Sequence, residues 1–499
     1  MKSENRAEKL RHPPFFRDHH VNGKPVLPAV EAMESLAAAG NALFPEAGTA
    51  AIDAAAFDKF LFLDSGEEST PVYCQFDRHN NGSVRATLQT KTRAGKAAIT
   101  RTRVHAAMTI GGGKVPVPAL PLDLAAAPEG ICRTVSPERL YAELVPFGSA
   151  YRNIVKTLFL GNDGALARVD SPRLPDGRKD LVLGAPYPLD AAFHAACAWS
   201  QYTRHIVAFP VAIDHRQILR PTRLDETCIA RIVPREVTGE ILVYDIFIYD
   251  RQGNLCEVSS GVRMRDISGG RTHPPDWIRK QDGEGQLTHI EKSGSHLAVI
   301  EHRCVAPFVD QALSPLELQR YGPMVAKRKN SFAAARLALK RLSRKLSGQS
   351  LQRAPGEINT VQVDSPKPVC PVIARSKAPL CSVSHDSRFA VAVAADKPVG
   401  IDVEQITAKA LQNLRLFTDE SEAALTKHFV EGEAAAALRV WSAKEAAAKA
   451  LDLPLAQTWD RVKLTALGSN ASRLEVEGLG TREVIHDTVD DHLFTLLIL

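Results

Sequence analysis

Apolar residues recur along the chain with two different periods, and each period predicts a type of element. In residues 29–44 (AVEAMESLAAAGNALF), Val30, Met33 and Ala37 follow the three-to-four-residue spacing of one helix face. A second apolar run, residues 191–202 (AAFHAACAWSQY), has a similar character. Two long helices, each with a buried face, are therefore predicted in the first half of the chain.

Alternating polar and apolar residues predict strands. In residues 240–267 (EILVYDIFIYDRQGNLCEVSSGVRMRDI), apolar residues alternate on both sides of a turn at residues 250–254, which is the pattern of a β-hairpin. Residues 400–404 (GIDVE) indicate another strand, and residues 441–451 (WSAKEAAAKAL) indicate a helix. The chain therefore mixes helices and strands, and we expect an α+β fold.

Glycine, proline and charged residues interrupt these patterns in three places. The main interruption begins at residue 268 and lasts to about residue 285, a shorter one covers residues 111–118, and a third covers residues 347–368. A length of 499 residues is enough for two or three domains. We predict an N-terminal domain over residues 10–268 with halves at about 10–112 and 129–268, a linker over 269–285, and a C-terminal domain over 286–499.

Composition narrows the class of protein. With 44% hydrophobic and 24% charged residues, the chain is typical of a globular protein. The net charge of +5 does not indicate nucleic acid as a partner, and no apolar stretch has the length of a membrane span. The eight cysteines show no CxxC pair or metal-site spacing, and the N-terminus lacks a hydrophobic signal core. We expect a cytoplasmic protein with free thiols, bound neither to nucleic acid nor to a membrane.

Acidic residues near the C-terminus predict a metal site. Asp402 and Glu404 are two residues apart on a predicted strand, so their side chains share one face. Paired carboxylates repel unless a cation lies between them, and Mg²⁺ prefers a few oxygen ligands supplemented by water and phosphates. Glu445 on the predicted helix can add a third carboxylate, with Lys444 beside it and Lys449 one turn further on. The sequence therefore predicts Mg²⁺ beside a phosphate-bearing ligand.

Three motifs occur in order: SVSHDSRFAVAVA (382–394), VGIDVE (399–404) and WSAKEAAAKAL (441–451). With a basic segment upstream that ends near Arg336, they resemble the 4′-phosphopantetheinyl transferases of the surfactin-synthetase type, from about residue 290 to the C-terminus. The resemblance implies a two-lobed α+β domain. It also implies a holo-[acyl-carrier-protein] synthase, which moves phosphopantetheine from coenzyme A to a serine of an apo acyl carrier protein.

The resemblance also implies roles for residues. Asp402, Glu404 and Glu445 would hold Mg²⁺ on the pyrophosphate of coenzyme A. Coenzyme A itself would contact a set of polar and basic side chains: Ser384, His385, Lys327, Arg328, Lys329, Lys367, Lys444 and Lys449. The family places a glutamate base in an F-[ST]-x-x-E segment, and here that slot holds Ser421. We therefore take Glu422 as the candidate base, with Glu420 as an alternative and Glu445 as a residue that could share the role.

The N-terminal half carries a second signature. The pattern HxxxGxxxxP begins at His19, residues 189–194 (LDAAFH) open the second apolar run, and residues 147–152 (FGSAYR) form a degenerate YGPxF element. These features resemble the dehydratase domains of polyketide and polyunsaturated fatty acid synthases, over roughly residues 10–268. The resemblance implies a double hotdog, in which an antiparallel sheet wraps a long helix in each half.

The chemistry of dehydration fits the residues at these motifs. Removing water from a β-hydroxyacyl thioester needs a base at the α-carbon, and a neutral histidine is suitable near pH 7. It also needs an acid at the β-hydroxyl, and an aspartic acid can donate its proton only where an apolar pocket raises its pKa. Asp190 lies between apolar neighbours, although it could instead be a helix N-cap. His20 competes with His19 for the role of base, and the spacing of the motif favours His19.

Together the two resemblances predict a bifunctional enzyme of polyketide or fatty acid biosynthesis. Its partners would be acyl carrier protein, in the apo form and in the β-hydroxyacyl form, and other synthase domains or subunits; a homodimer is left open. Two alternatives keep the transferase but make the double hotdog an aldol cyclase (product-template) domain or a scaffold without chemistry. A cationic helix predicted at residues 336–345 (RLALKRLSRK) is interpreted either as a docking face for an acidic carrier or as a solvent-exposed face.

Overall fold

The computed structural model describes residues 2–64, 66–93, 100–111, 116, 118–173, 177–179, 181–238, 240–280, 287–348, 353–365, 367–372 and 379–499. Parts of the three predicted interruptions lie outside these described residues. The chain forms two compact units: unit 1 comprises Met1–Pro118 and Arg133–Lys280, and unit 2 comprises Ala119–Cys132 and Gln281–Leu499. Each unit is described by itself.

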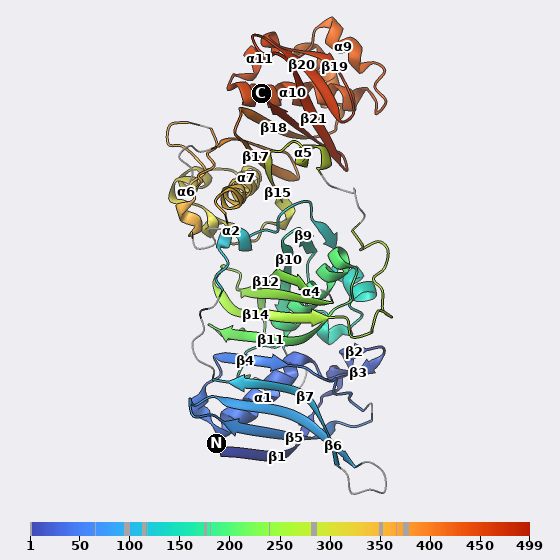
Figure 1. The fold of residues 1–499 in the computed structure, drawn as a ribbon, viewed down its shortest axis with the longest axis vertical. Helices are drawn as coiled ribbons and strands as arrows, with labels where there is room; N and C mark the ends of the chain where they lie inside the picture. Colours follow the sequence, from blue (N-terminus) through green and yellow to red (C-terminus); the bar gives the residue numbers. More distant parts are fainter. Residues whose placement is uncertain are drawn as a thin grey trace. The chain divides into compact units, whose positions relative to one another are not determined.

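Unit 1 is built on one twelve-stranded sheet in which all neighbouring strands are antiparallel (Figure 1). The strand order is β1-β5-β6-β7-β4-β11-β14-β13-β12-β10-β9-β8. The first half supplies β1 (Lys2–Arg11), β4 (Ala51–Ala56), β5 (Ser69–Arg78), β6 (Val84–Arg93) and β7 (Thr100–Ile110), besides a small ribbon of β2 (His20–Val21) and β3 (Lys24–Pro25). The second half supplies β8 (Arg133–Val135), β9 (Leu158–Gly161), β10 (Gly164–Ser171), β11 (Phe209–Ile218), β12 (Glu226–Thr238), β13 (Ile241–Tyr249) and β14 (Leu255–Arg265). The pair β4–β11 joins the two halves into one sheet.

Each half of unit 1 packs one long helix against its own strands. Helix α1 (Ala29–Leu43) contacts β6 and β7, and helix α4 (Tyr187–Arg204) contacts β10, β12 and β13. Val30, Met33 and Ala37 are buried, so the apolar stripe of the sequence is the face that α1 turns to the sheet. The predicted helices, the predicted hairpin (β13–β14) and the double hotdog are confirmed. A further short helix in this unit is α3 (Pro137–Arg139).

The polar segment after β14 packs on unit 1, although its composition is typical of a flexible linker. Ile278 is fully buried in the core of unit 1, and the backbone N–H of Lys280 donates a hydrogen bond of 3.0 Å to the carbonyl of Tyr202. The Arg139 guanidinium lies 3.5 Å from the ring centroid of Trp277. The described part of the segment predicted as a linker, up to Lys280, therefore packs on unit 1. Ile278, the Trp277 ring and the Lys280 N–H together attach this glycine- and proline-rich segment to unit 1.

Unit 2 contains two sheets. The three-stranded sheet has the order β15-β17-β16, with β15 (His296–Glu301), β16 (Leu380–His385) and β17 (Phe389–Ala395). The five-stranded sheet has the order β18-β22-β21-β20-β19, with β18 (Val399–Gln405), β19 (Val462–Ala466), β20 (Ala471–Val476), β21 (Gly480–Val489) and β22 (His492–Ile498). Its helices are α2 (Leu122–Ala125), α5 (Thr288–Glu291), α6 (Pro315–Tyr321), α7 (Ala326–Leu346), α8 (Ala408–Gln412), α9 (Glu420–Thr426), α10 (Glu433–Leu451) and α11 (Leu455–Arg461). No helix in the described part of the chain is long and apolar enough to cross a membrane.

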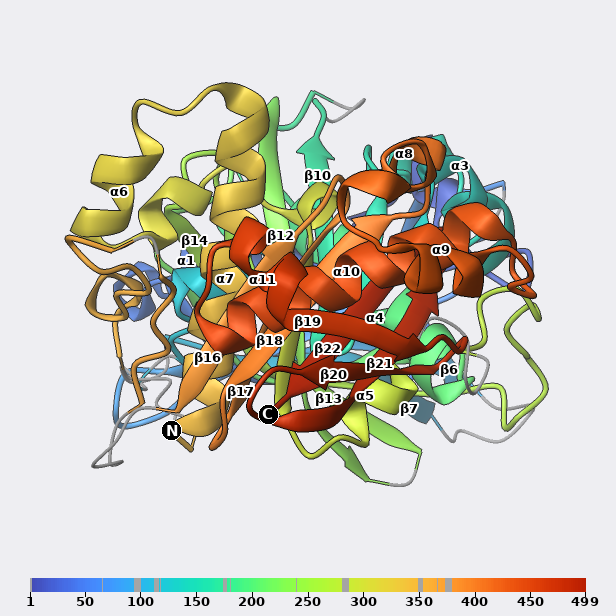
Figure 2. The same cartoon turned by 90° about the horizontal axis from the view of Figure 1, so that it is seen from above.

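One long helix covers each sheet of unit 2. Helix α7 packs on β15, β16 and β17, and helix α10 lies across β18 and β22 (Figure 2). The approach of α10 to β18 is very close, because a Cβ atom at Gly400 would lie 1.9 Å from the carbonyl oxygen of Ala446. Only glycine allows this contact. The contact brings the strand that carries Asp402 and Glu404 against the helix that carries Glu445.

The structure agrees with neither interpretation of the cationic segment at residues 336–345. It forms the C-terminal half of α7, and four of its five cations (Arg336, Lys340, Arg341 and Arg344) are buried, whereas Lys345 is exposed. The helix is therefore neither a solvent-exposed face nor a docking face for a carrier. Residues far away in the sequence neutralise these cations, which a local pattern cannot reveal.

Candidate active sites

The first site surrounds His19 in unit 1. This residue follows a short 3-10 helix, and its backbone is held at both ends: its N–H donates to Phe16 O at 3.1 Å, and its carbonyl accepts from Val26 N–H at 3.0 Å. Among the described residues, the buried Nδ1 atom of the His19 ring has no hydrogen-bond partner. Burial lowers the pKa of His19 to about 4, although the nearby negative charge of Asp190 opposes the shift. The ring is therefore neutral near pH 7 and able to accept a proton.

Asp190 comes from the other half of unit 1 and lies, almost fully buried, in the first turn of α4. Its Oδ2 atom is 3.1 Å from Nε2 of His194 one turn later, but the two atoms are not aligned as a hydrogen bond. On the far side of the His194 ring, Nδ1 is 3.4 Å from the hydroxyl of Tyr141. That hydroxyl in turn accepts a hydrogen bond of 2.9 Å from the N–H of Ile154. The His194 ring thus lies between Tyr141 and the carboxyl group.

His19, Asp190 and His194 all line one cavity, which has a volume of about 80 Å³. Most of its remaining wall is apolar and comes from both halves of unit 1, with Leu27 and Met264 as examples. His19, and not His20, is among the described residues that line it. The cavity thus combines a neutral histidine with a buried carboxyl group in apolar surroundings, which is the combination that acid–base chemistry on an acyl chain needs.

Sequence reasoning did not single out Asp18, which holds the degenerate YGPxF turn. Its Oδ2 atom accepts hydrogen bonds from the Ala150 N–H at 2.8 Å and from the Ser149 hydroxyl at 3.2 Å. Its carbonyl accepts from the Gly148 N–H at 2.7 Å. A Cβ atom at Gly148 would lie 2.3 Å from Cγ of Asp18, so a glycine is required there. That glycine was the only sequence signal for the contact.

The second site centres on Asp402 in β18 of unit 2. The carboxylate is buried, and three side chains hold it in one orientation. Oδ1 accepts from the Ser384 hydroxyl at 2.9 Å and from Lys449 Nζ at 2.8 Å, while Oδ2 accepts from the Ser442 hydroxyl at 2.8 Å. The motifs that carry these residues are well separated in the sequence, and the structure brings them together.

Two further carboxylates lie beside Asp402. Among the described residues, neither Glu404 nor Glu445 makes a side-chain hydrogen bond. Burial, and then the charges of Asp402 and Glu445, raise the pKa of Glu404 to about 7. Burial and Asp402 also raise the pKa of Glu445. A cation beside Asp402 would offset the repulsion that disfavours the charged forms of Glu404 and Glu445.

The donor set fits Mg²⁺, although it is not a complete cage. Within the described ranges, no three histidine, cysteine, aspartate or glutamate side chains already converge as metal ligands. Mg²⁺ commonly binds through one or two carboxylates and completes its shell with water and substrate phosphates. Glu404 and Glu445 have free oxygen atoms for this purpose, and Asp402 is already bonded to Lys449.

A cationic neighbourhood lies next to these carboxylates. Partial burial lowers the pKa of His385 at the end of β16, and the positive charges of Lys449 and Arg336 lower it further. The His385 ring lies 6.4 Å from the ring of His302. Arg336 is held by the carbonyl of Thr360 at 2.9 Å. The positive charges of Arg336 and Lys449 beside a carboxylate cluster suit a pyrophosphate and its metal ion.

The remaining basic candidates lie at the surface of unit 2. Lys327 and Arg328 are exposed in the first turn of α7, and Lys329 lies 5.0 Å from the ring centroid of Tyr321. Lys367 forms an ion pair with Asp452. No contact of these four cations with the carboxylate cluster is recorded among the described residues.

Glu422 and Lys444, two candidates from the sequence, form an ion pair with each other in unit 2. Lys444 Nζ lies 2.9 Å from both carboxylate oxygens of Glu422, and both side chains are buried. Glu422 also accepts from the Leu464 N–H at 2.7 Å and completes the N-terminal cap of α9 with Asp419. These contacts give Glu422 a structural role, and its role as the base for a carrier serine stays a prediction. Lys444 points to Glu422, and its contact with coenzyme A likewise stays a prediction.

Comparison with known families gives three matches along the chain. A family model described as "Polyketide synthase dehydratase domain" matches residues 6–91, and one described as "Polyketide synthase dehydratase N-terminal domain" matches residues 119–273. The third, described as "4′-phosphopantetheinyl transferase superfamily", matches residues 398–496.

Among curated proteins, the chain is 25% identical over 174 residues to the polyketide synthase PksM of Bacillus subtilis (strain 168). That match covers 32% of this chain and only 4% of the length of PksM.

Similar solved structures include several isolated dehydratase domains. A trans-AT polyketide synthase dehydratase from Brevibacillus brevis is 20% identical with a TM-score of 0.43, and the match covers 53% of this chain and 94% of that one. The dehydratase from the CurF module of curacin polyketide synthase is 19% identical with a TM-score of 0.44, over 53% of this chain and 93% of that one. A dehydratase domain of a mycocerosic acid synthase-like synthase is 19% identical with a TM-score of 0.42, over 54% of this chain and 92% of that one.

The double-hotdog architecture of unit 1, the carboxylate cluster of unit 2 and the three family matches agree with one another. The chain joins a polyketide synthase dehydratase region to a domain of the 4′-phosphopantetheinyl transferase superfamily.

Proposed function

We propose that unit 2 transfers 4′-phosphopantetheine from coenzyme A to a serine of an apo acyl carrier protein. The observation that carries this proposal is the cluster of Asp402, Glu404 and Glu445 beside Lys449 and His385. A new P–O bond forms between the serine oxygen and the β-phosphorus of the pyrophosphate, the old P–O bond breaks, and 3′,5′-ADP leaves. Positioning and charge neutralisation account for most of the catalysis in such transfers.

In this proposal, Asp402, Glu404 and Glu445 hold Mg²⁺, which supplies neutralisation of the pyrophosphate charge. Lys449 binds a phosphate oxygen while Asp402 keeps its ammonium group in place. His385 and the cations at the start of α7 contact the remaining phosphates of coenzyme A. Because Glu422 is committed to Lys444, Glu445 is the residue that accepts the proton of the carrier serine.

The test of the transferase is direct. The full chain is incubated with coenzyme A, Mg²⁺ and a panel of apo carrier proteins, and the mass of each carrier is measured. A gain of one phosphopantetheine group on a carrier serine is expected. No gain on any carrier, with a known transferase as a positive control, would contradict the proposal.

We further propose that unit 1 dehydrates β-hydroxyacyl groups bound to an acyl carrier protein. The neutral His19 takes the α-proton, and Asp190, buried in the same cavity, protonates the departing hydroxyl group. The C–H and C–O bonds break, a C=C bond forms, and one water leaves. The His194 ring lies beside the carboxyl group of Asp190, with Nε2 3.1 Å from Oδ2. The observation that carries this proposal is the unpartnered His19 Nδ1 in a cavity shared with Asp190.

A β-hydroxyacyl carrier tests the second activity. Incubation with the full chain should produce the enoyl form, seen as loss of one water from the acyl-pantetheine arm. Conversion of a poly-β-keto carrier to a cyclised product, without conversion of the β-hydroxyacyl carrier, would replace dehydration by aldol cyclisation. The carrier protein, in both forms, and other synthase domains or subunits are the partners that these proposals require.

A further inference from the structure

Residues 119–132 stand between the two halves of the dehydratase in the sequence, yet they fold as part of unit 2. The segment is well packed there. Ala125, Ala126 and Ala127 are completely buried, and Asp123 is only 1% exposed. A flexible connector between two hotdogs would instead be exposed along its length.

Arginine side chains of helix α7 bind the first part of this segment. Arg344 Nε donates to Oδ2 of Asp123 at 2.7 Å, and Arg344 Nη2 donates to Oδ1 at 2.7 Å, which makes a bidentate ion pair with both partners buried. Arg341 Nη2 donates to the carbonyl of Ala127 at 2.7 Å. Such paired, planar contacts fix orientation as well as position.

The second part of the segment forms hydrogen bonds with β15 and with the turn that follows β15. The N–H of Gly130 donates to Val299 O at 2.8 Å, and the N–H of Cys132 donates to Oε1 of Glu301 at 2.8 Å. In return, the N–H of Ala306 donates to the carbonyl of Ala126 at 2.7 Å. The segment thus binds the small sheet of unit 2 through its backbone as well as through Asp123.

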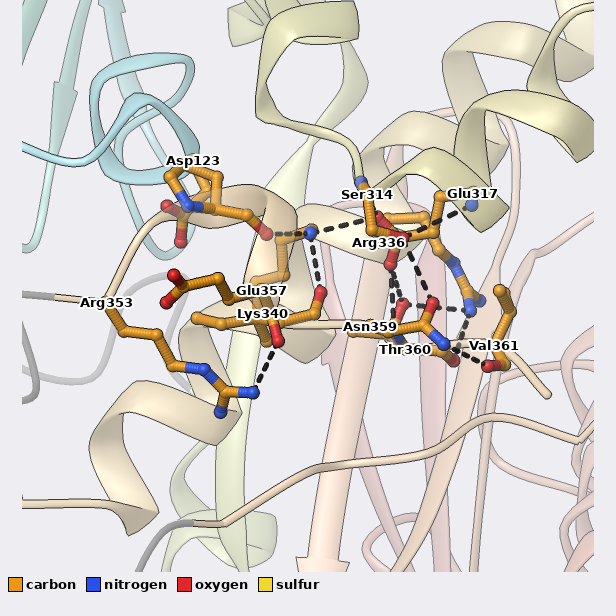
Figure 3. Close-up of polar contacts among 12 residues, drawn as sticks. Asp123, Ser314, Glu317, Arg336, Lys340, Arg353, Glu357, Asn359, Thr360 and Val361 are labelled. Atoms are coloured by element: carbon orange, nitrogen blue, oxygen red, sulfur yellow. Dashed lines mark hydrogen bonds and ion pairs between the residues drawn. The ribbon is translucent and has the colours of Figure 1, made fainter.

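The charges on α7 explain why an aspartate stands at this place. Arg336, Lys340 and Arg344 follow one another at four-residue intervals, and all three are buried. Lys340 Nζ is 2.9 Å from Oε2 of Glu317, and Figure 3 shows this pair within the polar cluster that also contains Asp123. Glu317 and Asp123 are the buried carboxylates that face this row of cations. Without Asp123, Arg344 would lose its anion in a buried site, which is strongly unfavourable.

The elements that the segment anchors also carry the proposed coenzyme A contacts. Helix α7 carries Arg336, whose positive charge acts on His385. The strand that ends at Glu301 is followed directly by His302, whose ring lies 6.4 Å from His385. A shift of the segment would therefore move both walls of that cationic neighbourhood.

We propose that residues 119–132 complete the coenzyme A-binding lobe of the transferase, and that Asp123 is a positioning residue for it. This inference rests on the proposed transfer function. The second half of the dehydratase is then an insertion in the sequence of the transferase domain. A fragment that begins after the predicted linker (269–285) would therefore lack one element of that domain.

Asp123→Asn in the full chain tests the inference. The variant keeps the shape of the side chain but leaves Arg344 without its anion. We expect the melting temperature of the transferase transition to fall by about 6–20 °C. In the folded fraction at low temperature, we expect the KM for coenzyme A to rise by roughly 10- to 100-fold with a smaller change in kcat, because misplaced binding groups weaken ground-state contacts. Dehydration of a β-hydroxyacyl carrier by the same sample should be unchanged.

Two further variants keep the test decisive if Asp123→Asn does not fold. Arg344→Lys retains the charge and loses the bidentate fork, so it should raise the KM for coenzyme A in the same direction but by less. Asp310→Asn, at an exposed aspartate of the same unit, is the matched control and should behave as wild type. A wild-type KM and melting temperature in Asp123→Asn would overturn the inference. Absence of transfer by the wild-type protein would instead overturn the proposed function.

Discussion

Asp18 and Ala150, one from each half of the double hotdog, are joined by a hydrogen bond of 2.8 Å from the Ala150 N–H to Oδ2 of Asp18. The next residue after Asp18 is His19, whose ring lies 4.3 Å from the ring of Phe147 in the same turn as Ala150. The contact therefore fixes the histidine of one half against the half that supplies Asp190. It explains how a site split between two hotdogs keeps one geometry.

We expect Asp18→Ala to lower the rate of dehydration by roughly 10²-fold, because displacement of a catalytic group by about 1 Å has a cost of this order. Phosphopantetheine transfer by the same sample should not change. Ser149→Ala removes only the longer bond of 3.2 Å and should have a small effect. Asp64→Ala, at an exposed aspartate of the same half, is the matched control. Full dehydration activity in Asp18→Ala would show that the contact does not position His19.

His19→Ala and Asp190→Asn should each reduce conversion of a β-hydroxyacyl carrier to the enoyl form by about 10²–10⁴-fold, the usual contribution of one acid or base. Asp190→Asn keeps the shape of the side chain and removes its acidic proton. His20→Ala is the control, because His20 is not among the described residues that line the cavity. An inactive His20→Ala together with an active His19→Ala would reverse the assignment of the base.

The low pKa of His19 predicts an unusual pH dependence. Because burial lowers this pKa to about 4, the acid side of the kcat/KM profile for dehydration should stay flat through pH 6.5 and fall only near pH 4. The folded state also binds fewer protons at His19 than the unfolded state between these pH values, so stability should decrease as the pH falls from about 6.5 to 4. Urea unfolding at pH 7 and pH 5 should show a smaller pH effect in His19→Gln than in wild type.

Asp402→Ala, Glu404→Ala and Glu445→Ala should each abolish transfer from coenzyme A in the presence of Mg²⁺. The physical reason is that burial and the charge of Asp402 raise the pKa of both Glu404 and Glu445, and the three carboxylates together provide oxygen ligands for a cation. Glu433→Ala, at an exposed glutamate in the first turn of the same helix, should retain transfer. Near wild-type rates in Glu404→Ala or Glu445→Ala, measured by the mass of the carrier, would mean that the metal site lies elsewhere.

Glu422→Gln separates a structural role from a catalytic one. The variant leaves the buried Lys444 ammonium without its anion, so we expect a loss of roughly 3–5 kcal/mol in the free energy of unfolding of unit 2. Where the protein remains folded, kcat for transfer should be close to wild type. Glu420→Gln, at an exposed glutamate two residues earlier, is the control. A normal unfolding profile combined with a large loss of kcat would restore Glu422 as the base.

Local features of the chain were sufficient to predict several elements and some of the side chains that lie together. The helical period of residues 29–44 gives α1, and the two-residue period of a strand places Asp402 and Glu404 on one face. The order of short motifs indicated which side chains would meet, and Ser384, Asp402 and Lys449 are in direct contact. These predictions depend on spacings of a few residues, which the backbone geometry of a helix or strand fixes.

Only the tertiary structure decided how charges are neutralised. Asp123 and Arg344 are 221 residues apart, and nothing near the cationic helix indicates that its charges are buried rather than exposed. The residues around Glu422 have the composition of an exposed helix, but the structure pairs Glu422 with Lys444 in the interior. A charged side chain has the same local pattern whether water or a distant carboxylate surrounds it. Its environment is set by packing between elements, because burial of a charge is tolerated only where a partner from elsewhere in the chain meets it.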